Sequence, residues 1–465
     1  MRACSSSVTL AGFGAIASLL LASLGACGSS NDSTFDGGGV PEAGSDADPP
    51  FDLDASRDAH PCVGLECRKV SCDNGQKTTL TGKVLDPSGT VPLYNALVYV
   101  PNAAVEAFAP GVVCDRCGTV PSGSPIATAL TNAKGEFVLE DVPAGADVPL
   151  VVQIGRWRRQ VVVPSVAKCT GTPVASDLTR LPRSKAEGDI PKIAITTGNA
   201  DSLECFVRKL GIDPAEMSNP AGTGRIHLFR GNGATVDGST PDAPTLWNDA
   251  AALKRYDMVI LSCEGAEHNE TKPPAAMENL RSYLDSGGRV FASHFHYTWF
   301  ENGPAPLRST ASWVNNGNAP DQVVDIDTSF AKGEAFADWL VEVGASSTRA
   351  KVPMTELRRN VTAVPGAGAP ADTSRRWISA PNAGAADTKF YSFNTPVGAP
   401  PAQQCGRGVY TDIHVSSGDD STGTFPANCK TSGFTAQEKA LLFLLFDLAS
   451  CVQDDNEIPA PPPVR

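Results

Sequence analysis

Apolar strand segments alternate with helical segments between residues 188 and 452, and no other feature constrains the fold as strongly. The first four strand segments of this part are 192–197, 226–229, 257–263 and 289–294. Later strand segments precede a closing helix at 435–451: 376–379, 390–393 and 409–414. Parallel strands need long crossover connections, and helices in those connections cover both faces of the sheet. This part is therefore predicted to be an α/β domain with a parallel sheet.

Residues 62–178 carry a different pattern, in which short strand segments are separated by turns. The strand segments are 79–85, 96–100, 126–131, 136–139, 148–154 and 160–163. Residues with turn chemistry, such as Pro87, Gly89, Asn132 and Gly135, lie between them. We therefore predict a multidomain chain in which an all-β sandwich precedes the α/β domain, with enough residues for each domain to build its own core.

Four signatures follow one another in the predicted sandwich. They are G-K-V at 82–84, A-L-V at 96–98, T-N-A-K-G-E-F at 131–137 and V-P-A-G at 142–145. This order resembles the carboxypeptidase regulatory-like, transthyretin-like sandwich family. The resemblance implies a domain that supports or orients its neighbour, so no catalytic residue is assigned to it.

Three segments of the α/β domain carry a second resemblance. They are Y-D-M-V-I-L at 256–261, Y-L-D-S-G-G-R-V-F-A-S-H at 283–294 and G-R-G-V-Y-T-D-I-H at 406–414. Together they resemble the class I glutamine amidotransferase-like superfamily, which has a flavodoxin-like sheet, and its ThuA-like branch in particular. Amidotransferases place a nucleophilic cysteine on the turn that ends the second of these segments. Here that turn carries His294 and we expect no cysteine near it, so the resemblance implies the fold without glutamine hydrolysis.

Polar side chains follow the predicted strands at the edge where open α/β sheets bind ligands. The catalytic candidates are Glu264, His294 and His414. The candidate ligands of a divalent metal are His294, His296, Asp412 and His414, because imidazole and carboxylate groups bind borderline metals such as zinc. His294 and His296 are two residues apart, as are Asp412 and His414, so each pair is expected on one face of its strand. In the alternative interpretation, these histidines only form hydrogen bonds within an enzyme fold that has lost its ligand.

The N-terminal residues are typical of an export signal. Arg2 precedes an apolar stretch at 8–24, which closes on Leu24-Gly25-Ala26-Cys27. This arrangement resembles the bacterial lipobox and implies a signal peptide at 1–26 with lipidation of Cys27. Residues 27–61 are rich in Gly, Ser, Asp and Pro and are predicted to form a disordered acidic tether. Because Gly28 rather than Asp follows the cysteine, we expect an anchor in the outer membrane.

Charge and cysteine content agree with an exported protein. The net charge is -13, and no basic stretch rich in aromatics supports nucleic-acid binding beyond a short cluster at 156–159. Of the 13 cysteines, eleven follow Cys27, and we favour disulfides over a zinc site at Cys114 and Cys117. Because eleven is odd, one thiol must be unpaired, and Cys263 in an apolar strand is the best candidate. The acidic, proline-rich end at 453–465 is predicted to be disordered.

Two functions from different classes remain open on the sequence alone. The first is an envelope lipoprotein, held to the membrane by its lipid, that binds or scaffolds a glycan or protein partner without catalysis. The second is a surface hydrolase or sugar-modifying enzyme that uses the histidine and carboxylate groups or a metal. The missing amidotransferase cysteine favours the first, and the clustered histidines favour the second.

Overall fold

The computed structural model describes residues 62–314, 317–365, 374–382, 385–415, 419–430 and 433–464. The predicted signal peptide, the predicted lipidation of Cys27 and the predicted acidic tether lie outside these residues. None of the helices in the described ranges has both the length and the apolar character that crossing a bilayer requires.

The first part of the described chain is a pair of small sheets. One has the order β4 (Glu136–Leu139), β1 (Thr79–Lys83) and β7 (Gly171–Pro173). The other has the order β3 (Pro125–Leu130), β2 (Leu97–Pro101), β5 (Gly145–Ile154) and β6 (Trp157–Val166). Alternation drives this packing: in β4, Phe137 and Leu139 are buried whereas Val138 is 54% exposed. Three short helices accompany the sheets: η1 (Gly64–Arg68), η2 (Asp73–Gly75) and α1 (Ser176–Thr179).

A ten-stranded sheet organises the rest of the chain. Six strands are parallel: β19 (Gly406–Thr411), β12 (Arg289–Ser293), β11 (Met258–Leu261), β8 (Ile193–Thr197), β10 (Ile226–Arg230) and β9 (Met217–Ser218). Beyond β19 the sheet continues with antiparallel strands: β18 (Ala385–Thr395), β17 (Arg375–Asn382), β14 (Gln322–Ile326) and β15 (Lys351–Met354). The prediction of a parallel sheet therefore holds for one part, and the whole sheet is mixed. A separate pair is formed by β13 (Ser312–Trp313) and β16 (Val361–Ala363).

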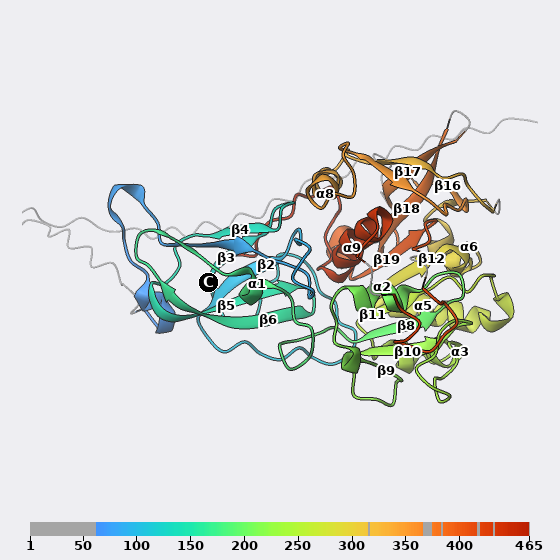
Figure 1. Ribbon diagram of the computed structural model, residues 1–465, viewed down its shortest axis with the longest axis horizontal. Coiled ribbons are helices and arrows are strands. Elements are labelled where there is room, and N and C mark those ends of the chain that lie inside the picture. Colours follow the sequence, from blue (N-terminus) through green and yellow to red (C-terminus); the bar gives the residue numbers. More distant parts are fainter. Residues whose placement is uncertain are drawn as a thin grey trace, which may run out of the picture. The chain divides into compact units, whose positions relative to one another are not determined.

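Helices cover both faces of this sheet (Figure 1). One face packs against α2 (Leu203–Lys209), α8 (Ala331–Glu342) and α9 (Ala436–Ala449). The other packs against α3 (Pro244–Trp247), α4 (Ala250–Leu253), α5 (Pro274–Asp285), α6 (Thr298–Glu301) and α7 (Ala305–Arg308). The remaining helices of the described chain are η3 (Pro214–Glu216), η4 (Asn269–Thr271), η5 (His294–Tyr297) and η6 (Pro401–Gln403). A capping box formed by Thr435 and Glu438 fixes the start of α9.

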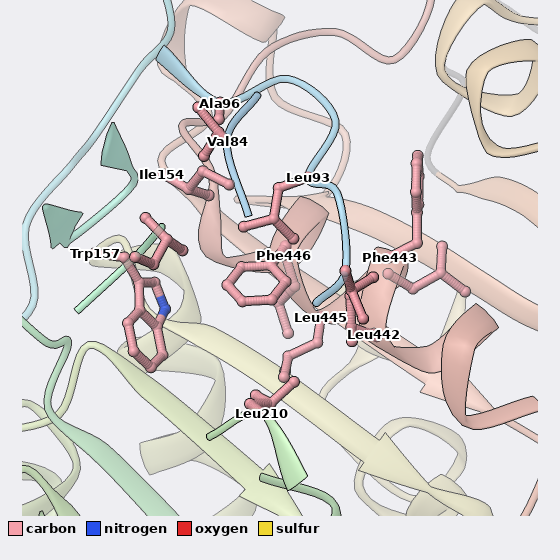
Figure 2. Close-up of a cluster of buried hydrophobic side chains, with 14 of the residues drawn as sticks. Val84, Leu93, Ala96, Ile154, Trp157, Leu210, Leu442, Phe443, Leu445 and Phe446 are labelled. Atoms are coloured by element: carbon pink, nitrogen blue, oxygen red, sulfur yellow. The ribbon is translucent and has the colours of Figure 1, made fainter. Parts of the chain in front are cut away.

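The sandwich and the α/β part share one hydrophobic core. Figure 2 shows Leu93 and Trp157 of the sandwich beside Leu445 and Phe446 of α9. The indole of Trp339 in α8 also donates a hydrogen bond of 2.7 Å to the Pro92 carbonyl. The expectation that each domain has its own core is therefore corrected, because residues 440–446 of α9 are all apolar and pack against both parts.

Disulfides also link the sandwich to the α/β part. Two of them join the long segment after β2 to the α/β part: Cys114–Cys405 and Cys117–Cys451. Three more are Cys62–Cys67, Cys72–Cys169 and Cys205–Cys429. Among the described cysteines only Cys263 is free, and it is buried, as the odd count and its strand position predicted.

The C-terminal end differs from its prediction. Residues 453–464 are described and make specific contacts rather than forming a disordered tail. Asp455, only 8% exposed, lies 3.0 Å from the buried guanidinium of Arg407. Thr128 of β3 donates a hydrogen bond of 2.8 Å to the Pro462 carbonyl. Asp455 thus offsets a buried positive charge, which composition alone does not show.

Candidate functional site

Three side chains meet at the carboxyl ends of adjacent parallel strands. Because β12 lies between β11 and β19, the residues that follow these strands come together at one edge. His294 Nδ1 lies 3.4 Å from Cys263 Sγ and 3.1 Å from His414 Nε2. We call Cys263, His294 and His414 the elbow cluster. His294 starts η5 with a φ of 40°, so the chain turns sharply there and directs the imidazole toward its neighbours.

All three members of the elbow cluster are closed off from solvent. Their exposed fractions are 0% for Cys263, 3% for His294 and 2% for His414. Burial lowers the pKa of His294 to about 2 and that of His414 to about 3. Burial also raises the pKa of the Cys263 thiol to about 12. Both imidazoles and the thiol are therefore neutral at pH 7.

Hydrogen bonding defines the tautomers in the elbow cluster. Arg358 Nη2 donates to His414 Nδ1 over 3.3 Å. Since arginine has no acceptor, neutral His414 carries its proton on Nε2 and donates it to His294 Nδ1. Backbone N–H groups of Phe295 and Gly265 point at the Cys263 sulfur and lower its pKa, although burial outweighs them.

His296 belongs to a separate arrangement, although the sequence grouped it with His294. Its Nε2 donates to the Ser262 carbonyl over 2.8 Å, and its Nδ1 accepts the Trp299 indole N–H over 3.0 Å. Burial lowers the pKa of His296 well below its ordinary value. Both ring nitrogens are used, so this imidazole has no lone pair left for a metal.

Asp412 is likewise engaged by its surroundings. One carboxylate oxygen accepts backbone N–H groups of Asn360 and Val361 over 2.8 and 3.1 Å, and the other accepts the Tyr410 hydroxyl over 2.7 Å. Burial raises the pKa of this carboxyl. Asp412 thus holds the segment before β16 against the sheet, and the structure does not add it to the elbow cluster.

Glu264 lies beside His296 and pairs with a buried lysine. Its Oε2 is 2.6 Å from Lys272 Nζ and 3.8 Å from His296 Nε2. Burial raises the pKa of Glu264, and Lys272 opposes that rise. Of the predicted site residues, the structure therefore brings His294 and His414 together, places Glu264 beside His296, and holds Asp412 in hydrogen bonds of its own.

The expectation that no cysteine lies near the elbow is wrong. Cys263 is 31 residues away in sequence, but parallel pairing of β11 with β12 aligns the ends of these strands. The signal was available in principle, because Cys263 follows an apolar strand and His294 follows the next one. It was missed because a buried strand thiol is usually part of the core.

A second candidate site is a cavity of about 310 Å³ within the same compact part of the chain, where the sandwich and the α/β part meet. We call it the junction cavity. Its wall includes the disulfide-bonded segment at 106–122, the β5–β6 turn and part of the C-terminal end. Gln153, which lines this wall, has a buried Oε1 atom without a hydrogen-bond partner. Arg158 stacks its guanidinium over Phe108, 4.0 Å from the ring centroid, and both line the cavity.

Comparisons with known proteins give only distant likenesses. No family model matches the chain. No curated protein matches it either. A ThuA-like protein from Bacteroides uniformis is a structural neighbour with 12% identity and a TM-score of 0.28, covering 54% of this chain and 88% of that one. A type II cohesin–X-dockerin complex from Acetivibrio cellulolyticus has 16% identity and a TM-score of 0.16, covering 27% and 78%. Likenesses this weak carry no conclusion about function.

Proposed function

We propose that this protein is a lipid-anchored envelope protein that binds a glycan in its junction cavity and performs no chemistry there. The observation that carries the proposal is the cavity itself. Its volume of about 310 Å³ lies at the lower end of the range for small-molecule sites, and such sites often form where two folded parts meet. A saccharide ligand is favoured over a protein partner because the cavity is small.

The lining of the junction cavity suits a ligand rich in hydroxyl groups. The buried Oε1 of Gln153 has no hydrogen-bond partner, so it needs to accept a hydrogen bond from water or from a ligand. Glu106 and Asn95 add polar side chains, whereas Leu97 and Val120 add apolar surface. A few polar groups on an apolar wall can orient a sugar while its ring carbons contact the apolar part.

The elbow cluster gives less support to the hydrolase alternative. Nucleophilic catalysis by a thiol needs the thiolate, and burial raises the pKa of Cys263 to about 12. Histidine in general acid–base catalysis needs a pKa near the working pH, but the pKa of His294 is lowered to about 2. Glutamine hydrolysis in particular would need a reactive nucleophile at the elbow, where this chain has an imidazole.

The glycan proposal can be tested by calorimetric titration of the mature chain in detergent with soluble disaccharide-peptide fragments of peptidoglycan. Saturable binding is expected. Gln153→Leu should weaken it because the polar acceptor is lost, and Thr119→Trp should abolish it because the indole fills the cavity. The matched control is Gln160→Leu, an exposed glutamine on the same hairpin that does not line the cavity. Absence of binding, or equal binding by all variants, would contradict the proposal.

The membrane anchor is part of the same proposal and rests on the sequence. Two or three acyl chains on Cys27 would hold the protein firmly, since each buried CH₂ contributes about 0.8 kcal/mol. Intact mass spectrometry of the mature protein should show a chain that starts at Cys27 and carries diacylglycerol. A different first residue, or an unmodified sulfur at Cys27, would remove the anchor from the proposal without affecting the junction cavity.

A further inference from the structure

The elbow cluster presents three metal-binding atoms at the spacing of one coordination sphere. Cys263, His294 and His414 each offer one ligand atom within 4.8 Å of the other two. His294 Nδ1 lies 3.4 Å from Cys263 Sγ and 3.1 Å from His414 Nε2. Ligand atoms spaced 120° apart at about 2.0–2.3 Å from a metal are separated by about 3.5–4.0 Å. Small side-chain movements would therefore suffice to bring all three atoms onto one ion.

The identity of the three donors selects among metals. A thiolate is a soft ligand that favours Cu(I) and Zn(II) over Mg²⁺ or Ca²⁺. Structural zinc sites almost always have four protein ligands. Within the described residues the cluster has three members, and the neighbouring His296 and Asp412 are already committed to other partners.

We propose that Cys263, His294 and His414 form a binding site for a single copper(I) ion. A closed three-coordinate site excludes water, which suits a d¹⁰ ion that needs no further ligand. The site is independent of the junction cavity, and neither proposal requires the other.

The surroundings of the cluster can stabilise the bound ion. The N–H groups of Phe295 and Gly265 already point at the Cys263 sulfur and would stabilise its anion. For His414 to coordinate through Nε2, its proton must move to Nδ1. Glu356 Oε2 lies 4.0 Å from that nitrogen and is the acceptor available, provided that the Arg358 side chain swings aside.

Binding is a ligand exchange without electron transfer. The S–H bond of Cys263 breaks, its proton goes to solvent, and a copper–sulfur bond forms together with two copper–nitrogen bonds. On His414 the proton that leaves Nε2 is replaced by one on Nδ1. Copper enters and remains as Cu(I), so no oxidant or reductant is needed.

The test is an anaerobic titration of the mature full-length chain with Cu(I) in competition with bicinchoninate, a coloured Cu(I) chelator. The wild type should remove one equivalent of copper from the chelator. X-ray absorption should then show one sulfur and two nitrogen neighbours. Cys263→Ser, His294→Asn and His414→Asn should each weaken binding by at least about 100-fold, and Glu356→Gln by about 10-fold through the second coordination shell.

The matched control is His227→Asn, which removes another buried imidazole, one that is bonded to Tyr256 and the Gly224 carbonyl. It should bind copper as the wild type does. Circular dichroism establishes that each variant is folded. The X-ray absorption spectrum of the copper-loaded wild type reports the ligands directly, without any variant. Failure to retain Cu(I), binding of Zn(II) but not Cu(I), or an equal loss in His227→Asn would overturn the proposal.

Discussion

Asp201 is a buried acid whose protonation should influence stability around neutral pH. One of its oxygens accepts the Val415 N–H over 2.9 Å, and the other accepts the Ser293 hydroxyl over 2.5 Å. Burial nevertheless raises its pKa from 3.8 to about 7. The folded state therefore binds this proton more tightly than the unfolded state. The stabilisation is full below about pH 4 and is lost as the pH rises through 7.

Asp201→Asn imitates the protonated acid and should remove this pH dependence. At pH 8 the variant should be more stable than the wild type, by up to about 2–4 kcal/mol, and the advantage should shrink toward pH 5. Urea unfolding at several pH values measures the difference. Asp177→Asn, at an exposed position, is the control and should show no such trend. A difference that does not vary with pH would contradict the assignment.

Cys263 should be protected from alkylation for as long as the protein is folded. The side chain is 0% exposed and burial raises its pKa to about 12, whereas an unfolded thiol has a pKa of about 8.5. N-ethylmaleimide at pH 8 should leave the native protein unmodified at Cys263 and label it completely in guanidinium. Without reductant, peptide mapping should find no label on the ten disulfide-bonded cysteines. Rapid labelling of the native protein would show that the cluster is open.

For single residues, the sequence predicted which side chains follow the strands but did not predict their hydrogen-bond partners. Placement at strand ends predicted that His294 and His414 would approach each other, and they do. The same reasoning grouped His296 with them, yet the Ser262 carbonyl, 34 residues away in sequence, takes its Nε2 proton. Which nitrogen of an imidazole remains available depends on such distant partners, and periodicity does not contain them.

Among the elements, buried strands and long helices were predicted well because their patterns are local. The expected strand at 289–294 is β12 at Arg289–Ser293, and the expected helix at 435–451 is α9 at Ala436–Ala449. The antiparallel strands β14 and β15 were not foreseen. Alternation is weak in β14, where Val323 is 53% exposed, and β15 has only four residues. The direction of pairing is decided by partners far along the chain.

The turn between β5 and β6 should tolerate no side chain at Gly155. Its φ is +51°, and an added Cβ would lie 1.8 Å from the Ala449 carbonyl oxygen at the end of α9. Gly155→Ala should cost at least about 2 kcal/mol, from left-handed strain together with displacement of the helix end. Thermal unfolding measures this loss.

Gly118→Ala provides the matched control for Gly155. Gly118 also has a positive φ, +82°, but an added Cβ there would meet nothing within 4 Å. This variant should show only the conformational cost, about 1–2 kcal/mol. If the two substitutions had equal effects, the close packing of the β5–β6 turn on α9 would be refuted.

On the scale of the whole molecule, α9 and two disulfides bind the sandwich to the α/β part. Turn residues predicted the sandwich, and alternation of strands with helices predicted the α/β part, because both patterns depend on residues close together in sequence. Their common core was not predictable, because the apolar stretch 440–446 of α9 indicates burial but not which residues cover it. The disulfide partners Cys117 and Cys451 are separated by 334 residues and have no local signature.

Removing the Cys117–Cys451 disulfide should therefore lower stability without separating the two parts. With Cys114–Cys405 still closed, this bridge constrains a further loop of about 50 residues, which corresponds to about 4 kcal/mol in the chain-entropy description. Cys117→Ala/Cys451→Ala should melt in a single calorimetric transition at a lower temperature, since the shared core still couples the parts. Cys62→Ala/Cys67→Ala, which opens a loop of separation 5, should lose only about 2 kcal/mol. Two separate transitions in the first variant would mean that the disulfides, rather than the core around α9, make the molecule one cooperative unit.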